Sequence, residues 1–401
     1  MSVLDRVERI LKRVAEVEGI SNCEITPNLE TLSGDGFLSE FYTGNIKNKD
    51  TGELLQIYIK VKPPRGTKII EPAFINEVNF YAKILPELDQ FQRVQGVKEP
   101  FDKIPKFYCG SLEEGQEYLA LIDLKALDYV LLDKSQFIDE KHLRLIFETY
   151  GKYHALTFAY KASNPEKYQT LMKPIQDVFG VFKDFEEITT GMAERLNLSY
   201  DYIKTTDAEI AARLKLLIAD VPAAFSRGFD YVGKYSTLVH GDCWSNNILF
   251  KYQPNGELEN LKLLDHQLIR DTTPVHDLSY FLYSGGSKAD FDKLDEYLEL
   301  YYRSFSSFAT ELGFDPKELF PFEALKRDWK RFALMGVFMG IMLWEVKFMS
   351  KKEIQKLGVG TTDEQEMQKS YTEYAKVVRQ HPEFLKNISN IIIHAAEYGV
   401  I

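Results

Sequence analysis

Three polar side chains in the second half of the chain have the types and spacing that phosphoryl transfer needs. Asp242 follows His240-Gly241, Asn247 comes five residues after Asp242, and Asp265 ends an apolar run eighteen residues after Asn247. In phosphoryl transfer, one carboxylate accepts the proton of the attacking hydroxyl, while an Asn and a second carboxylate hold the Mg²⁺ that neutralises the triphosphate. The pattern therefore indicates a kinase.

The stretch between Asn247 and Asp265 predicts a β-hairpin that brings these two residues together. Asn255-Gly256 is a strong hairpin signal because both central positions of a type I′ turn need positive φ. With that two-residue turn Asn246 lies opposite Asp265, whereas a longer loop pairs Asn247 with Asp265. Either register brings an asparagine to within about 5 Å of Asp265 across the ladder. Each residue alone could be an ordinary loop or cap residue, but together with the hairpin they indicate a metal site.

The composition narrows the class of protein. The chain has 401 residues, 45% of them hydrophobic, and a formal net charge of −11, so a large core is expected and a nucleic-acid or anionic membrane partner is not. Three scattered cysteines, Cys23, Cys109 and Cys243, suit neither a disulfide framework nor a thiolate metal site. The N-terminal 19 residues predict an amphipathic helix and not a signal peptide. We expect a cytoplasmic monomer whose partner is a small molecule.

Two regions of different texture follow each other along the chain. Short alternating runs separated by turn residues between about 25 and 125 predict an antiparallel sheet with one helix. Long helical patterns dominate afterwards, at roughly 136–161, 175–197, 203–220, 288–312, 322–350 and 362–397. The expected fold is α+β with two lobes, a small β-rich lobe at 1–124 and a mainly helical lobe at 125–401.

The motifs resemble those of a known family. His240-Gly241-Asp242-Cys-Trp-Ser-Asn-Asn247, then Leu-Leu-Asp265, is similar to the aminoglycoside phosphotransferase and choline kinase superfamily, and the longer string through Pro-Val-His-Asp277-Leu-Ser-Tyr-Phe-Leu resembles the insect ecdysteroid kinase-like proteins. The resemblance implies a protein-kinase-like fold that binds ATP and Mg²⁺ between its lobes. It also implies that Asp242 is the catalytic base and that Asn247 and Asp265 are the Mg²⁺ ligands.

The resemblance also assigns residues upstream. Gly34, Gly36 and Ser39 would form a phosphate clamp, although a Gly-Asp-Gly segment alone is more typical of an ordinary turn. Lys60 and Lys62 share the polar face of one predicted strand, so parity cannot choose between them. The family pattern favours Lys60 as the phosphate lysine, with Lys62 as the second choice.

Four further assignments depend on the resemblance. Glu77, on a predicted helix, would be the partner of Lys60. Ile122 and Leu124 lie in the segment between the lobes, where the chain has Leu-Ile-Asp-Leu instead of the common Glu-Asp-Leu, and their backbone N–H and C=O groups would bind adenine. His240 would anchor the loop that carries Asp242, which we call the catalytic loop (residues 240–247), and Asp277 would accept backbone hydrogen bonds beneath it.

His266 departs from the family, which commonly has Phe after the metal-binding Asp. Packing is the favoured interpretation of this imidazole. The alternative is a hydrogen bond to the metal ligand, with a pH dependence near neutrality if the ring is protonated.

The acceptor is the least determined part of the prediction. Met and aromatic residues crowd the segment 329–344, which predicts plain core more often than a roomy apolar pocket, and only Glu345 nearby could serve a choline-like cation. A steroid-like alcohol, most simply an ecdysteroid, is therefore favoured. A kinase that detoxifies xenobiotic alcohols and a catalytically silent carrier of hydrophobic ligands are the alternatives.

Overall fold

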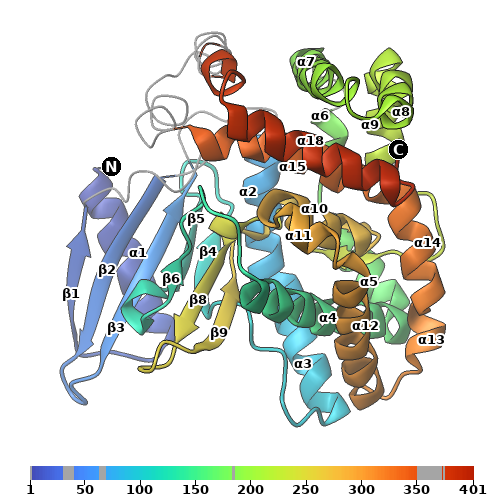
Figure 1. The fold of residues 1–401 in the computed structure, drawn as a ribbon. Coiled ribbons are helices and arrows are strands. Elements are labelled where there is room, and N and C mark those ends of the chain that lie inside the picture. Colours follow the sequence, from blue (N-terminus) through green and yellow to red (C-terminus); the bar gives the residue numbers. More distant parts are fainter. Residues whose placement is uncertain (1, 30–39, 63–68, 183–185, 350–372, 374) are drawn as a thin grey trace.

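A computed structural model describes the chain apart from residues 1, 30–39, 63–68, 183–185, 350–372 and 374. It has the expected α+β architecture, with a small antiparallel sheet next to a larger, mainly helical part (Figure 1). The division at residue 124 stays a prediction, although the sheet ends just before it.

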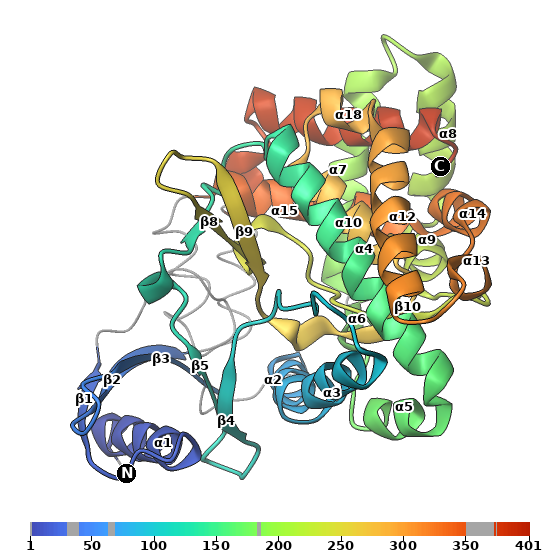
Figure 2. The same ribbon diagram turned by 90° about the horizontal axis from the view of Figure 1, so that it is seen from below.

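The smaller lobe is a five-stranded antiparallel sheet in the order β1-β2-β3-β5-β4. Its strands are β1 (Cys23–Asn28), β2 (Glu40–Asn48), β3 (Leu54–Val61), β4 (Phe107–Ser111) and β5 (Tyr118–Ile122). The sheet curves around α1 (Val3–Val17), as Figure 2 shows. The apolar face of α1 closes a small core of its own with Ile46, Ile57 and Ile59, so the N-terminal amphipathic pattern serves to cover the sheet.

One long helical segment lies between β3 and β4, as the pattern predicts. It consists of α2 (Ile70–Asn79), a π-helical turn at Phe80–Ile84 and α3 (Leu85–Gln95). The apolar side chains Phe74, Val78 and Phe80 belong to the large core that the helical lobe forms. The segment therefore attaches the sheet to that lobe and carries Glu77 between them.

The helical lobe also contains a few short strands, some of which lie on its side next to the smaller lobe (Figures 1 and 2). Its helices are α4 (Glu140–Ser163), α5 (Pro165–Met172), α6 (Val178–Phe182), α7 (Glu186–Ile203), α8 (Ala208–Ala219), α9 (Val221–Phe229), α10 (Val275–Gly285), α11 (Lys288–Phe291), α12 (Leu294–Glu311), α13 (Pro316–Leu319), α14 (Phe322–Phe332), α15 (Leu334–Phe348) and α18 (Pro382–Glu397). Its strands are β6 (Val130–Leu131), β7 (Thr237–Val239), β8 (Ile248–Tyr252), β9 (Leu258–Leu263) and β10 (Arg270–Thr272). β8 pairs with both β6 and β9, and β7 pairs with β10.

Several of the long predicted helices are divided. The segment 322–350 was expected to be one helix, but Ala333 separates α14 from α15, and 288–312 is divided into α11 and α12. In the segment 362–397, residues 362–372 lie outside the described residues, residues 375–378 are helical, and α18 begins at Pro382, whose ring suits the first turn of a helix and not its interior. Periodicity located most of the long helices but missed these boundaries and the helices α5, α9 and α10.

Helices α10 and α15 pack at very close range. A Cβ on Gly336 would lie 2.3 Å from the backbone of Ser279, and one on Gly340 would lie 2.8 Å from Tyr283. The glycine pair therefore allows another helix to approach closely. It also fixes the position of α10, which lies under the catalytic motif.

Candidate active site

The β8–β9 hairpin joins the two acidic motifs, but its turn differs from the prediction. Gly256 has a φ of +84°, whereas Asn255 is not among the described non-glycine residues with positive φ, so the type I′ turn is wrong. The Gly256 N–H donates to the Gln253 carbonyl at 2.8 Å, and Gln253 N–H donates to the Glu257 carbonyl. This is a three-residue loop with glycine in the left-handed position.

An irregularity in the ladder compensates for the longer loop. Tyr252 pairs with Leu258, but Lys251 pairs with Asn260, so one additional residue lies on β9. The pairing of Ile248 with Leu263 then continues to a hydrogen bond of 2.8 Å from the Leu264 N–H to the Asn247 carbonyl. This is the register that the two-residue turn predicted, although the ladder itself ends there, because Ser245–Asn247 form a 3-10 turn and Asp265 has a left-handed backbone.

The loop that carries Asp242 is held from below by Asp277. The Asp277 carboxylate accepts the backbone N–H groups of His240 and Gly241, each at 2.8 Å, and is 3.1 Å from the ring of His154. Burial opposes the charge, but the hydrogen bond from His154 and the two neighbouring histidines hold the pKa of Asp277 below its usual value. This confirms the predicted role of Asp277.

Two further contacts shape the same loop. The His240 ring lies 2.7 Å from the Leu264 carbonyl through Nε2 and accepts the Asp242 N–H through Nδ1, so it links the loop to the second motif as expected. Gly241 has a φ of +85°, and a Cβ there would lie 1.9 Å from the Leu268 carbonyl oxygen. Only glycine fits this position.

The Asp242 carboxylate is buried, and a different element supplies a donor to each oxygen. The hydroxyl of Tyr280 on α10 donates to Oδ1 at 2.9 Å, and the side-chain amide of Asn247 donates to Oδ2 at 2.7 Å. Burial, with the nearby Asp265 charge, raises the pKa of Asp242 to about 7 in spite of these donors. A carboxyl with a pKa near neutrality is well suited to general base catalysis.

The side chains of Asn247 and Asp265 are suited to a magnesium ion. The Asn247 amide nitrogen is engaged by the Asp242 carbonyl at 3.0 Å as well as by Oδ2, so its oxygen is the atom left to bind a cation. Asp265 has a left-handed backbone (φ 62°, ψ 62°), which is rare for a residue other than glycine and is often found at functional sites. Oxygen ligands fit Mg²⁺.

The part of the chain that the structure describes forms no complete protein cage for a metal. The described residues contain no group of three or more His, Cys, Asp or Glu placed to hold an ion. Mg²⁺ in nucleotide sites typically takes only one or two protein ligands and completes its shell with phosphates and water. The Asn247 and Asp265 pair meets that requirement.

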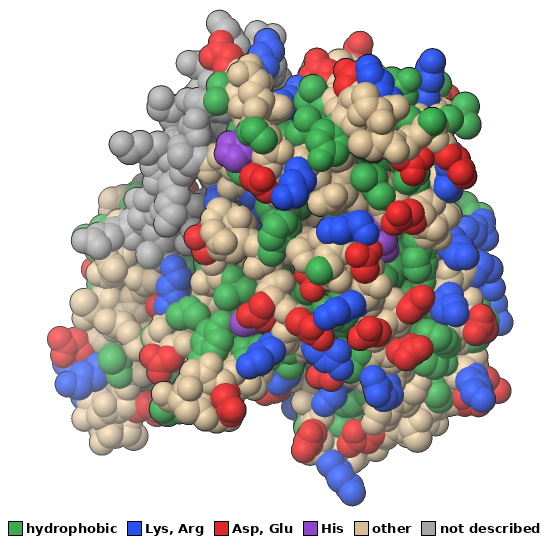
Figure 3. All heavy atoms as spheres, in the orientation of Figure 1, with side chains coloured by type: hydrophobic (Ala, Val, Ile, Leu, Met, Phe, Trp, Pro, Cys, Tyr) green, Lys and Arg blue, Asp and Glu red, His purple; other side chains and the backbone are tan. Residues whose placement is uncertain are grey.

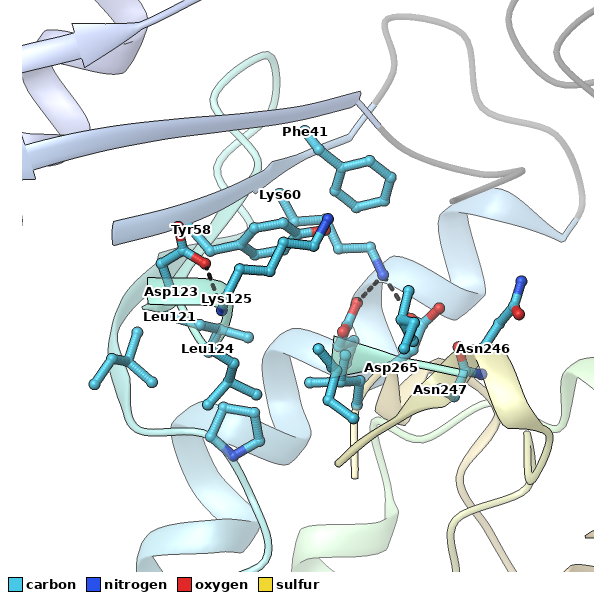
Figure 4. Close-up of a pocket in the computed structure, with 16 residues that line it drawn as sticks. Phe41, Tyr58, Lys60, Leu121, Asp123, Leu124, Lys125, Asn246, Asn247 and Asp265 are labelled. Atoms are coloured by element: carbon cyan, nitrogen blue, oxygen red, sulfur yellow. Dashed lines mark hydrogen bonds and ion pairs between the residues drawn. The ribbon is translucent and has the colours of Figure 1, made fainter. Parts of the chain in front are cut away.

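Lys60 joins the sheet to the metal site. Its ammonium lies 2.6 Å from Glu77 on α2 and 2.6 Å from Asp265, and Figure 4 shows it pointing at Asp265. Burial would lower the pKa of Lys60, but the two carboxylates outweigh that effect and raise the pKa above its usual value. Lys62 instead pairs with Glu117 at 2.6 Å, so the structure brings only Lys60 into the constellation.

Lys60, Glu77, Asn247 and Asp265 line one cleft of about 840 Å³, including its open mouth, and Asp242 lies behind Asn247 and is not among the lining residues (Figure 4). Phe41 and Tyr58 from the sheet stack on each other at 5.5 Å on one side, and Leu249 and Leu264 lie among the apolar residues of its wall. The cleft thus combines apolar surfaces with a polar end.

The segment between the lobes also lines this cleft, with one correction. Ile122 and Leu124 both contribute to the wall. However, the Ile122 N–H donates to the Lys106 carbonyl at 3.0 Å and is not free for a ligand, because it belongs to the edge that β5 shares with the segment before β4. Ile122 therefore retains only its carbonyl for adenine recognition. Gly34, Gly36 and Ser39 lie outside the described residues.

His266 is packed among aromatic rings. It is fully buried, its ring stacks on Phe80 with centroids 3.9 Å apart, and neither ring nitrogen has a hydrogen-bond partner. Burial, with His240 and Lys60 nearby, lowers the pKa of His266 well below its usual value. The favoured packing role agrees with this geometry, and the protonated alternative is wrong because a buried imidazolium would have no counter-charge in contact.

The Met- and aromatic-rich segment is core. Trp329, Met335 and Phe338 are fully buried in the large hydrophobic cluster, and none of them lines the cleft. Glu345 is also buried and is held by Arg195 and by Arg379, the latter at 2.6 Å. The steroid pocket inferred from this stripe therefore has no support in the packing, and neither does a free carboxylate for a choline-like cation.

Sequence reasoning missed Tyr280, Phe41 and Tyr58. Tyr280 is three residues after Asp277, and that helical spacing could have placed both side chains under the same loop. Tyr58 lies two residues before Lys60, and strand parity places it on the same face. Phe41 pairs with Lys60 only through the β2–β3 register, which the sequence did not reveal.

The described part of the surface shown in Figure 3 has positive and negative side chains interspersed over the helical lobe. No helix in the described ranges is long and apolar enough to cross a lipid bilayer.

Comparison with known proteins identifies the family. The model of the ecdysteroid kinase-like family matches residues 33–314. No curated protein sequence matches the chain.

Several solved structures are similar in fold and distant in sequence. They include an ethanolamine kinase from Plasmodium vivax (12% identity, 95% of this chain and 91% of that chain, TM-score 0.43). A choline kinase from Cryptosporidium parvum Iowa II has 12% identity, 95% coverage of both chains and a TM-score of 0.42. A glucosamine kinase in complex with glucosamine, ADP and inorganic phosphate has 11% identity, 94% and 95% coverage and a TM-score of 0.31. The family match extends over both acidic motifs, Lys60 and Glu77, and the chain belongs to the ecdysteroid kinase-like family of small-molecule kinases that phosphorylate alcohols.

Proposed function

We propose that this protein transfers the γ-phosphoryl group of ATP directly to the hydroxyl of a hydrophobic alcohol, with an ecdysteroid as the first candidate. The observation that carries the proposal is the convergence of Lys60, Glu77, Asn247 and Asp265 around one cleft, with Asp242 hydrogen-bonded to Asn247. These groups come from distant parts of the chain and from different helices, strands and loops.

Each side chain has a role that its surroundings support. Asp242 orients the alcohol and accepts its proton as the hydroxyl oxygen attacks phosphorus. Lys60, held by Glu77, positions the phosphates. The oxygens of Asn247 and Asp265 would hold Mg²⁺, which supplies neutralisation of the phosphate charge. No covalent enzyme intermediate is needed, because the alcohol attacks the phosphoryl group itself.

The apolar part of the cleft would bind the nucleotide base. The stacked pair Phe41 and Tyr58 offers an aromatic surface, and Leu249 and Leu264 offer aliphatic ones. The Ile122 carbonyl and the Leu124 N–H are the backbone groups that we assign to the adenine edge. The phosphate clamp at Gly34, Gly36 and Ser39 remains part of the proposal on the motif alone.

The decisive test of the mechanism is Asp242→Asn. The variant should bind ATP normally and lose turnover by about 10²-fold or more, because the general base is removed while the metal ligands stay. Asp123→Asn is the matched control, since Asp123 also lines the cleft but lies among the residues between the lobes. Full activity of Asp242→Asn would refute the assignment.

A panel of acceptors tests the substrate class. Purified protein with MgATP should phosphorylate ecdysone in preference to choline, ethanolamine and glucosamine, because the chain matches the ecdysteroid kinase-like family and because Glu345, the carboxylate that the sequence offered to a cationic substrate, is already paired with two arginines. Preference for plant or synthetic alcohols over ecdysone would favour the detoxification kinase. Ecdysone binding without ATP dependence or phosphate ester would favour the silent carrier.

A further inference from the structure

Tyr280 contacts the proposed catalytic base directly. It lies on α10, its side chain is buried, and its hydroxyl donates to Asp242 Oδ1 at 2.9 Å. Asn247 donates to the other oxygen, Oδ2, at 2.7 Å. The carboxylate is therefore held between a donor from the metal site and a donor from a helix that carries no metal ligand.

This arrangement fixes a torsion that is otherwise soft. The χ2 angle of an aspartate joins an sp³ to an sp² carbon, and its distribution is broad in the absence of directed contacts. Two donors from different elements, one on each oxygen, restrict the rotation of the Asp242 carboxylate about that bond. Each oxygen has about two lone pairs, so one position on each stays available for the proton of the alcohol.

We propose that Tyr280 is a positioning residue that sets the orientation in which Asp242 accepts the proton of the alcohol. The inference rests on the proposed function. In the step that it supports, the alcohol oxygen forms a bond to the γ-phosphorus, the bond from that phosphorus to the bridging oxygen of ADP breaks, and the alcohol proton passes to Asp242. Tyr280 keeps its own proton throughout.

The position of Tyr280 is determined by the packing of α10. Asp277, three residues earlier on α10, holds the backbone of the catalytic loop. The same helix therefore positions both this backbone and the carboxylate of Asp242. Residues Ser279 and Tyr283 of α10 pack so closely against Gly336 and Gly340 of α15 that neither glycine has room for a Cβ. This packing therefore holds the Tyr280 hydroxyl in position against the Asp242 carboxylate.

Tyr280→Phe removes the donor and retains the ring. The expected result is a fall of about 10- to 100-fold in the single-turnover rate of phosphoryl transfer, which is the effect of losing one hydrogen bond to a charged group. The KM and Kd for MgATP should stay within about twofold, because Lys60, Asn247 and Asp265 are untouched. The rate is measured with the best alcohol of the acceptor panel and with water as the phosphoryl acceptor.

Tyr283→Phe is the matched control. Tyr283 is on the same helix, is equally buried, and its hydroxyl lies 3.1 Å from His394 instead of Asp242. The same chemical change there should leave the single-turnover rate at the wild-type level. Melting temperatures of both variants are compared, so that a general loss of folding can be recognised.

The outcomes separate this inference from the proposed function. A Tyr280→Phe rate within about twofold of wild type, or an equal loss in Tyr283→Phe, overturns the role of Tyr280. So does a loss that appears as weaker MgATP binding or unfolding alone. In the Asp242→Asn background, Tyr280→Phe should add no further loss, since it acts through that carboxylate. High activity of Asp242→Asn itself would instead overturn the proposed function.

Discussion

At the scale of single residues, the site holds its carboxyl groups in surroundings that oppose their charge. Asp242 and Glu77 are both buried, and burial is the first cause that raises the pKa of each to about 7. Asp265 adds to the effect in both cases because its negative charge is close to each of them. The positive charge of Lys60 only partly offsets this accumulation of acid. A site of this kind is expected to cost folding free energy until a cation binds.

A stability measurement over pH tests that cost. Because the pKa of Asp242 is higher in the folded protein than in the unfolded chain, its contribution to stability is present below about pH 4 and is lost as the pH rises through about 7. Asp242→Asn does not titrate. In metal-free buffer the variant should therefore gain stability over wild type by about 1 kcal/mol or more between pH 5 and pH 8. A gain independent of pH, seen in denaturant titrations, would contradict the raised pKa.

His266 permits a second residue-scale prediction. Because both ring nitrogens are buried without partners, His266→Phe should preserve activity within about twofold and stabilise the protein by about 1 kcal/mol. His240→Phe is the control, since His240 links Leu264 to Asp242 and its loss should reduce both stability and activity. A large loss of turnover in His266→Phe, with MgATP binding intact, would assign the imidazole a chemical role.

At the scale of elements, the site depends on how α10 packs against α15. Gly336→Ala should destabilise the protein by about 1–3 kcal/mol, because the new methyl group overlaps the backbone of Ser279. It should also reduce turnover, since α10 carries Asp277 and Tyr280. Gly180→Ala is the control, because its Cβ would meet nothing closer than 3.6 Å and alanine favours a helix. Equal melting temperatures of the two variants would show that α10 tolerates displacement.

The hairpin shows at the same scale how a prediction can reach the right register through the wrong turn. Asn255-Gly256 marked the reversal of the chain correctly, and the pairing near Ile248 and Leu263 is the one that the two-residue turn implied. The loop itself contains one more residue, and an irregularity on β9 absorbs it. Such an irregularity has no clear sequence signal, because it depends on which residues the two strands bury against their neighbours.

At the scale of the whole molecule, Lys60 connects the two lobes. It belongs to β3 of the sheet and pairs with Asp265, which follows β9 in the helical lobe. Lys60→Met would leave the buried Glu77 and the partly exposed Asp265 without their cation, so we expect a loss of stability of about 3–5 kcal/mol. The variant should also bind MgATP more weakly and turn over at least about tenfold more slowly.

Lys62→Met on the same strand is the control for that variant. Its partner Glu117 lies within the smaller lobe, so the change should leave MgATP binding near the wild-type value. Calorimetric titration of MgATP with both variants checks the prediction. A larger loss of affinity for Lys62→Met than for Lys60→Met would identify Lys62 as the phosphate lysine.

The sequence by itself determined the chemistry and the order of the elements. The spacing of Asp242, Asn247 and Asp265 around a hairpin indicated a phosphoryl-transfer site, because hairpin pairing is local and follows from turn residues and strand parity. The alternating and helical patterns predicted a β-rich part followed by a helical part, because these patterns also depend on residues that are close together in the sequence. Assignment of the family and of Glu77 additionally required the resemblance.

Only the tertiary structure decided which side chains meet across long separations. It placed Lys60, and not Lys62, against Asp265, and it paired the Ile122 N–H with the Lys106 carbonyl. It also buried the Met- and aromatic-rich segment as core and brought Tyr280 to Asp242. These outcomes depend on how the sheet is set against the helices and on the close packing of α10 and α15. Periodicity shows which face of an element is apolar, but not which other element will cover it.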